Sequence, residues 1–278
     1  MTTHELLVES VKKLIEIESL DEWKNELLSK APPILWFGNS KSIKKKILTI
    51  GANPSRWEFL DSKLIRSSKV NLQKEYYEKY YLSKNRFCHL NENQDYKDLI
   101  VNEELRNQVI KSYDDYFINE PYHWFGKNQA DSYNVEGLLR GLNASYFEVD
   151  TKFRVCHIDI FPFATISDFK EIKNLSEKYL LKDKWAKGIV EKLLQSFDAK
   201  LILIFGRTNA EYFKKYFDID LTFSENWESK SGKGNCSYCI TSYNQTKLIA
   251  ISVNLGNPVG FNKVGLQELG MYLNELNN

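Results

Sequence analysis

The stretch "ILTIGANPS" at residues 47–55 decides the fold class of this chain. An apolar, β-branched run that stops at a glycine predicts a buried strand followed by a tight turn. Three later stretches have the same character: "FRVCHIDIF" (153–161), "AKLILIFG" (199–206) and "KLIAISVNLG" (247–256). Nearly continuous apolar runs are typical of parallel strands that are covered on both faces.

Helical patterns separate these strands. They are expected at residues 103–118, 134–142, 184–197, 208–217 and 264–276, and a helical pattern also opens the segment 4–29 before "APPILWFG" interrupts it. The stretch "CSYCITSYNQTK" (236–247) is interpreted as one arm of a hairpin. Residues 60–125 are polar, aromatic and longer than a crossover needs, which predicts an insertion that is helical in pieces.

We therefore expect one α/β domain over residues 1–278. Its predicted architecture is a three-layer αβα sandwich around a short four-stranded parallel sheet, with the long helical insertion at 60–125 after the first strand.

Composition narrows the possible partners and compartments. A net charge of +1 argues against a basic coat for non-specific nucleic-acid binding, although a local basic face is compatible with it. No apolar run approaches the roughly 20 residues of a membrane span, and no secretory signal is visible. The four cysteines are scattered, so we expect a cytoplasmic protein with reduced thiols. We also expect the protein to be a monomer. The single pair Cys236 and Cys239 is too small a ligand set, and we expect no metal and no cofactor.

Four loops follow the predicted strands: "GANPSRW", "DIFPFAT", "GRTNA" and "LGNPVGFNK". In open parallel sheets, ligands bind beyond the carboxyl ends of the strands, where such loops meet. Two of these loops place Asn-Pro next to a glycine. Because proline fixes φ and glycine permits close backbone approach, these loops are expected to hold an Asn side chain stiffly against a ligand. The alternative for "GANPS" is that Asn53 only caps a following helix.

The loops "GANPS" and "GNPVGFN" resemble the two signature loops of the uracil-DNA glycosylase superfamily, in its mismatch-specific and single-strand-selective branch. The strand "HIDIFPF" is similar to the base-reading strand of that branch, and the resemblance covers roughly residues 45–270. It implies an enzyme that flips a nucleotide out of DNA and hydrolyses its N-glycosidic bond without a cofactor.

Carried over residue by residue, the resemblance implies that Asn53 positions the attacking water. It implies that Asn257 contacts the base or the sugar. Gly51, Ala52 and Phe161 would then surround the base. Phe261 matches the wedge that fills the gap left by the flipped base. Candidates for phosphate contacts are Ser55, Arg207 and Lys263.

Asp159 departs from the family pattern, which has an Asn at this position. An Asn pairs with N3–H and O4 of uracil, whereas an ionised Asp only accepts and suits an exocyclic amine such as cytosine N4. Excision of ordinary cytosine would destroy the host genome, so we expect a modified cytosine. Some antiphage glycosylases that resemble this superfamily remove glucosylated hydroxymethylcytosine from phage DNA, and the insertion could hold such a sugar. The alternative for Asp159 itself is an ion pair with Arg154 or Lys152.

Three other activities stay open. They are uracil or mispair repair, DNA binding without catalysis, and an enzyme that acts on a small nucleoside. The second is favoured by the loss of the histidine and the serine from the second signature loop, where the chain reads Asn-Pro-Val.

The stretch "PYHWFG" (121–126) gathers aromatic side chains that could stack on a flipped base. We expect one of Tyr122, Trp124 and Phe125 to do so, with His123 as a surface candidate beside them. A buried hydrophobic anchor is the competing interpretation. His157 lies in an apolar strand and is expected to be structural.

Overall fold

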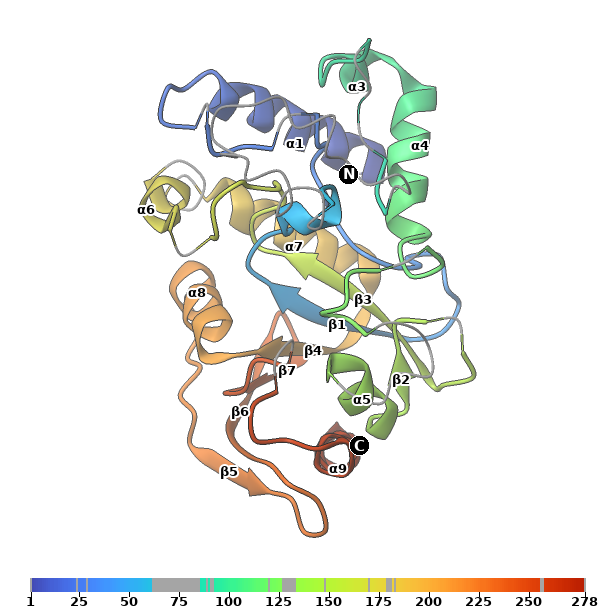
Figure 1. The fold of residues 1–278 in the computed structure, drawn as a ribbon, viewed down its shortest axis with the longest axis vertical. Coiled ribbons are helices and arrows are strands. Elements are labelled where there is room, and N and C mark those ends of the chain that lie inside the picture. Colours follow the sequence, from blue (N-terminus) through green and yellow to red (C-terminus); the bar gives the residue numbers. More distant parts are fainter. Residues whose placement is uncertain are drawn as a thin grey trace.

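The computed structural model contains a mixed sheet in the order β2-β3-β1-β4-β7-β6-β5 (Figure 1). It describes residues 2–23, 25–28, 30–61, 86–88, 90, 93–119, 121–126, 134–147, 149–169, 171–178, 182, 184–255 and 258–277. The described strands are β1 (Lys46–Gly51), β2 (Ala144–Ser145), β3 (Phe153–Asp159), β4 (Ala199–Phe205), β5 (Glu225–Glu228), β6 (Asn235–Tyr243) and β7 (Thr246–Ile251).

The four strands expected from the sequence form the centre of this sheet. They lie side by side as β3-β1-β4-β7, and each adjacent pair is parallel. Every residue of β3 is buried, and so are all of β1 after Lys46 and the last five of β4. This burial on both faces confirms the α/β class.

The sheet is larger than the expected four strands, and it is not purely parallel. β2 adds a short parallel edge, while β6 and β5 extend the other edge in antiparallel fashion. The hairpin interpretation of residues 236–247 explains part of this extension. Asn244 and Gln245 have φ of 47° and 67°, which suits a two-residue turn between β6 and β7. β2 has only two residues, too few for a period-2 pattern to be recognised.

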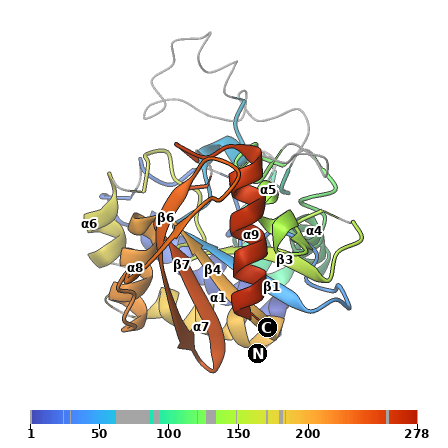
Figure 2. The same ribbon diagram turned by 90° about the horizontal axis from the view of Figure 1, so that it is seen from below.

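Helices cover both faces of the sheet (Figure 2). They are α1 (Thr3–Glu18), α3 (Asp98–Val101), α4 (Glu103–Asp114), α5 (Asn134–Gly141), α6 (Lys173–Ser176), α7 (Trp185–Phe197), α8 (Arg207–Phe217) and α9 (Lys263–Asn277), with a 3-10 turn η1 (Arg56–Glu58). Successive side chains of β6 point to opposite faces of the sheet, and two tyrosines of this strand identify a helix on each face. Tyr243 donates to Glu191 of α7 at 2.5 Å, and Tyr238 packs edge-on against Tyr272 of α9. No helix in the described ranges is long and apolar enough to cross a bilayer.

The N-terminal helix is shorter than the sequence pattern suggested. α1 starts with a capping box between Thr2 and Glu5 and ends at Glu18, although the segment was expected to run on towards residue 29. The chain beyond it turns to bury Trp23 and to dock on the loop after β3, where the Leu28 N–H donates to the carbonyl of Ala164 at 3.0 Å. This tertiary contact overrides the helical pattern.

The described part of the insertion at 60–125 contains the helices α3 and α4, which both contact α1, together with turns and irregular chain. Residues 62–85 lie outside the described residues.

The central strands end together at one edge of the sheet. Gly51 is opposite Asp159 across β1 and β3, and Phe205 is opposite Ile251 across β4 and β7. After β1 the chain continues to β2 and β3 on one side of the sheet, and after β4 it continues to β5, β6 and β7 on the other side. The loops after these strands therefore meet at a topological switch point, where open α/β sheets bind ligands.

Helices α5 and α9 pack closely against each other on one face of the sheet. A methyl group at Gly270 would overlap the carbonyl oxygen of Leu138, whereas one at Gly188 of α7 would meet no atom within 4 Å. We expect Gly270→Ala to lower the free energy of unfolding by roughly 1–3 kcal/mol through overpacking. Gly188→Ala should raise it by about 0.4–1 kcal/mol, because it restricts the unfolded chain. Urea unfolding of both variants measures these changes, and equal stability of Gly270→Ala and the parent would contradict the close packing.

Candidate functional site

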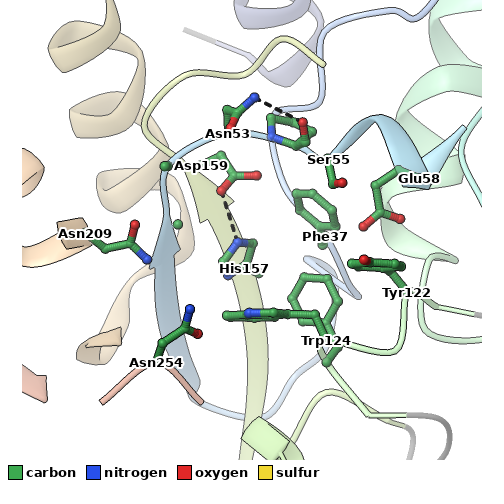
Figure 3. A pocket seen from close by; sticks show the side chains of 14 residues that line it. Phe37, Asn53, Ser55, Glu58, Tyr122, Trp124, His157, Asp159, Asn209 and Asn254 are labelled. Atoms are coloured by element: carbon green, nitrogen blue, oxygen red, sulfur yellow. Dashed lines mark hydrogen bonds and ion pairs between the residues drawn. The ribbon is translucent and has the colours of Figure 1, made fainter. Parts of the chain in front are cut away.

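A cavity of about 170 Å³, here called the first cavity, opens at the carboxyl edge of the sheet (Figure 3). Its walls come from segments that are far apart in the sequence. They include the loop after β1, the end of β3, the start of α8, the loop after β7 and the aromatic stretch 121–126. The residues that line it include Gly51, Asn53, Glu58, Trp124, His157 and Asp159.

Backbone hydrogen bonds fix the loop after β1 against the loop after β3. The N–H of Ile160 donates to the Gly51 carbonyl at 3.1 Å, and the N–H of Phe161 donates to the Ala52 carbonyl at 2.9 Å. The guanidinium of Arg56 donates to the carbonyl of Ile166. The two loops are therefore held as one unit, which pre-organises the side chains that they carry.

Asn53 is held by its amide nitrogen. Nδ2 donates to Oγ1 of Thr165 at 2.9 Å and to the carbonyl of Pro54 at 3.2 Å. Because both bonds use Nδ2, the side-chain oxygen Oδ1 is left to accept a hydrogen bond from a ligand or a water. The helix-capping role belongs instead to Ser55, whose Oγ accepts from the N–H of Trp57 at 3.3 Å.

Asp159 pairs with His157, and not with Arg154 or Lys152. Nε2 of His157 lies 3.2 Å from Oδ1 of Asp159, and both side chains are about 95% buried. In Figure 3 the second carboxylate oxygen of Asp159 points into the first cavity. The histidine thus fixes the carboxylate and leaves one acceptor for a ligand.

A chain of hydroxyl groups continues behind His157. Oγ1 of Thr49 lies 2.8 Å from Nδ1 of His157 and 2.8 Å from the hydroxyl of Tyr146. A carboxylate can only accept, so Nε2 donates to Asp159, and the direction of the bond between Nδ1 and Thr49 depends on whether Nδ1 carries a proton. This arrangement satisfies each buried polar atom and orients the imidazole. His157 was expected to be structural, and its contacts make it the support of Asp159.

Gly51 has a packing role at this pair. A Cβ atom there would overlap Oδ1 of Asp159 and would lie 2.7 Å from Nε2 of His157. The carboxylate and the imidazole can therefore lie against the backbone of β1 only because this position has no side chain.

Aromatic rings form the opposite wall of the first cavity. Tyr122, Trp124 and Phe125 all line it, together with Phe37. Trp124 is half-buried and its ring centroid lies 5.5 Å from that of His157, whereas Phe125 is 3% exposed and packs in the core. Trp124 and Tyr122 therefore offer the ring faces that a planar ligand could reach.

Glu58 is a further carboxyl group on this cavity. Its side chain is 3% exposed, and its Oε2 accepts from the hydroxyl of Tyr116 at 2.7 Å. Burial raises the pKa of Glu58 to about 8, and the negative charge of Asp159 adds to the rise. The charge of Arg86 and the hydrogen bond from Tyr116 act in the opposite direction. At neutral pH the cavity therefore contains a protonated carboxyl group.

A second cavity of about 410 Å³ adjoins the first one. The two share the segment 52–55, Trp124, Asn209 and Asn254. The walls that belong to the second cavity alone are mainly polar, and they include Arg56, Thr165, Ser167, Asp168, Thr208 and Tyr212. The guanidinium of Arg56 lies 4.0 Å from Asp168 and stacks 4.8 Å from the ring of Trp57, so its charge is paired within the wall.

The structure brings together six of the residues that the sequence selected. Gly51, Ala52, Asn53, Ser55, Trp124 and Asp159 all line the first cavity. His123 does not line it, because its side chain is exposed and stacks on Tyr122 at 4.2 Å. Phe161 is buried in the core, where it stacks on Trp23 at 5.7 Å. Asn257 lies outside the described residues.

The remaining selected residues lie away from both cavities. Arg207 and Lys263 are exposed on the first turns of α8 and α9. Phe261 is 7% exposed and stacks on Trp227 at 6.1 Å with the rings nearly parallel. In the same loop, Val259 is 79% exposed.

Sequence reasoning missed Glu58, Asn209 and Asn254. Asn209 lies in the first turn of α8, which follows β4 directly, and Asn254 lies in the loop after β7, so the strand-end rule could have selected both. Glu58 follows the "GANPS" loop by three residues, and only the fold reveals that its side chain is buried.

Cys236 and Cys239 are buried and free, and burial raises the pKa of the Cys236 thiol to about 12. Within the described residues, no group of three or more His, Cys, Asp or Glu side chains is placed to hold a metal ion.

Neither the scan against protein-family models nor the search of curated proteins finds a match to this chain.

The protonated carboxyl group makes stability depend on pH. The unfolded chain releases the Glu58 proton above its ordinary pKa of 4.5, whereas the folded chain keeps it up to about 8. Stability should therefore fall as pH rises through this window. We expect Glu58→Gln to remove that slope and to stabilise the protein on the order of 3 kcal/mol at pH 7.

Thermal melts between pH 4 and pH 9 measure this effect. Glu275→Gln, an exposed change on α9, is the matched control and should keep the slope of the parent. Parallel stability profiles for Glu58→Gln and the parent would contradict a buried, protonated Glu58.

Proposed function

We propose that this protein is a monofunctional DNA glycosylase. It takes a pyrimidine nucleotide flipped out of DNA and hydrolyses the N-glycosidic bond to leave an abasic site. The observation that carries the proposal is the meeting of Asn53, Asp159 and Trp124 around one cavity at the carboxyl edge of the sheet. These residues come from separate segments, and each matches a role that the reaction needs.

In this mechanism the flipped base enters the first cavity and lies against Trp124 or Tyr122. Stacking on such rings contributes about 1–3 kcal/mol per base. That gain offsets part of the few kcal/mol needed to unstack the nucleotide. Oδ1 of Asn53 accepts a hydrogen bond from the water that attacks C1′. A neutral amide is a poor base, so the C1′–N1 bond breaks ahead of water attack.

The base is selected by Asp159. His157 occupies Oδ1 of this carboxylate, and the remaining oxygen accepts from a ligand. An acceptor at this position favours the exocyclic amine of cytosine over O4 of uracil. The best candidate is a modified cytosine of phage DNA, of the glucosylated hydroxymethylcytosine type, which would make the protein an antiphage enzyme.

The second cavity supports a bulky modification. It adjoins the first and offers hydroxyl and amide groups, which suit the hydroxyl groups of a sugar. Among the described residues that line it, the cationic one is Arg56, which is already paired with Asp168, so a neutral polyol fits better than a phosphate. Residues 62–85 of the insertion that is expected to hold the sugar lie outside the described residues. Val259, as the exposed apolar side chain of the loop after β7, is a better wedge than the buried Phe261.

Base excision is tested on oligonucleotides, single- and double-stranded, that carry uracil, cytosine, hydroxymethylcytosine or its glucosylated form. We expect alkali-labile sites at the modified cytosines. Asn53→Ala should slow excision by about 10²-fold or more, because the water loses its position. Asn107→Ala, an exposed change on α4, is the control. Abasic sites in the uracil oligonucleotide alone would contradict the substrate, and Asp159→Asn should shift preference towards uracil.

The role of the second cavity is tested by filling it. Thr208→Phe adds a ring to an exposed position of α8 that lines this cavity, and Glu211→Phe on the same helix is a control that lines neither cavity. We expect Thr208→Phe to slow excision of the glucosylated base by at least about 10-fold relative to hydroxymethylcytosine. An equal loss on both substrates would indicate that the cavity contacts the DNA backbone instead.

A further inference from the structure

Glu58 is a buried carboxyl group that the mechanism above leaves without a task. It lies in η1, directly after the loop that carries Asn53, and its side chain lines the first cavity. Figure 3 shows its carboxyl group beside the ring of Tyr122, on the side of the cavity away from Asp159. A ligand in the cavity would therefore lie between two carboxyl groups.

The charged and titratable groups around Glu58 are Tyr116, Arg86 and Asp159. The hydroxyl of Tyr116 donates to Oε2 of Glu58 at 2.7 Å and accepts from the N–H of Tyr122 at 3.0 Å. The phenol is thus fixed between a backbone donor and the carboxyl group. Arg86 donates to the carbonyl of Trp57 at 2.6 Å, and its guanidinium lies 5.7 Å from the ring of Tyr122.

Packing alone does not explain a glutamate at this position. A carboxyl group that is 97% buried costs stability whenever the pH favours its ionised form. A glutamine would occupy the same volume and accept the same hydrogen bond from Tyr116 without that cost. The ionisable group therefore points to a task in proton transfer.

The two carboxyl groups of the cavity differ in their surroundings. Asp159 accepts a hydrogen bond from His157, whereas Glu58 accepts one from the hydroxyl of Tyr116 and is held in its neutral form by burial. Two carboxyl groups in different environments are a recurring arrangement for acid–base chemistry. Cytosine needs such help, because negative charge builds on the departing base as the bond breaks.

We propose that Glu58 is the general acid that protonates the departing base, an inference that rests on the proposed glycosylase function. When N4 of the base contacts Asp159, O2 lies on the other side of N3 and is turned towards Glu58. The C1′–N1 bond breaks, its electron pair moves onto the base, and the Glu58 proton transfers to O2. The oxygen of the water held by Asn53 bonds to C1′, and the proton that this water loses returns to the Glu58 carboxylate through solvent.

The test is the pH profile of single-turnover excision by the parent and by Glu58→Gln. General acid catalysis contributes about 10²–10⁴-fold, so we expect a loss of that size in Glu58→Gln. The rate of the parent should fall above pH 8, where Glu58 ionises, and Glu58→Gln should lack this descending limb. Glu275→Gln should keep both the rate and the limb. Melting of Glu58→Gln at or above the temperature of the parent excludes unfolding as the cause.

Substitutions at two residues beside Glu58 should shift the descending limb of the pH profile in opposite directions. Tyr116→Phe removes a hydrogen bond that lowers the pKa of Glu58, so the limb should shift to higher pH. Asp159→Asn removes a negative charge that raises this pKa, so the limb should shift to lower pH on the base that the variant excises. A purely structural Glu58 would produce neither shift.

Two results would overturn the proposal. If the parent excises a base and Glu58→Gln keeps its rate and its descending limb, the acid role is wrong while the glycosylase function stands. If the parent releases no base from any oligonucleotide of the panel, the glycosylase function fails and the acid role fails with it.

Discussion

The register between β1 and β3 is the constraint on which the site depends. It sets Gly51 opposite Asp159, and only a glycine lets the carboxylate and the imidazole of His157 lie against the neighbouring strand. Side chains alternate along a strand, so a slip of one residue would turn Asp159 to the other face of the sheet. Burial of both faces of the central strands excludes such a slip, because it would place the wrong residues in each half of the core. The packing of the sheet thus determines where the acceptor of the site points.

The same apolar surroundings control the electrostatics of the cavity. Phe37, Phe125 and Trp124 give apolar walls to the cavity that holds the two carboxyl groups. Ionising both would place two negative charges in a low-dielectric region, so one keeps its proton. The hydrogen bond from His157 positions the carboxylate of Asp159, and the chain through Thr49 to Tyr146 holds that histidine in position. The orientation of the acceptor in this cavity therefore depends on hydrogen bonds that lie behind the cavity wall.

The sequence was sufficient for the central sheet because its four strands are continuous apolar runs, and such runs have few alternatives in a folded chain. The sequence also predicted that the loop "GANPS" and Asp159 lie at the carboxyl edge of the sheet. The rule that ligands bind beyond the strand ends needs only the order of the strands. It could not reveal the edge strands β2 and β5, which are short and, for β5, mostly exposed. Nor could it reveal the burial of Glu58 or the stacking of Phe261 on Trp227. Both depend on contacts between segments that are distant in the chain, and local pattern carries no information about them.

The buried glutamate has a consequence for how this protein would respond to selection. Stabilising substitutions are easy to find in natural proteins, and their recurrent cost is a loss of function where activity needs a destabilising group. Selection for heat resistance alone at mildly alkaline pH would favour replacement of Glu58 by a neutral side chain of similar shape, since that change relieves an electrostatic penalty at no loss of volume. Laboratory evolution could therefore distinguish selection for stability from selection for catalysis at this one position. A glutamate retained at position 58 in a stabilised population would indicate that catalysis had also been under selection.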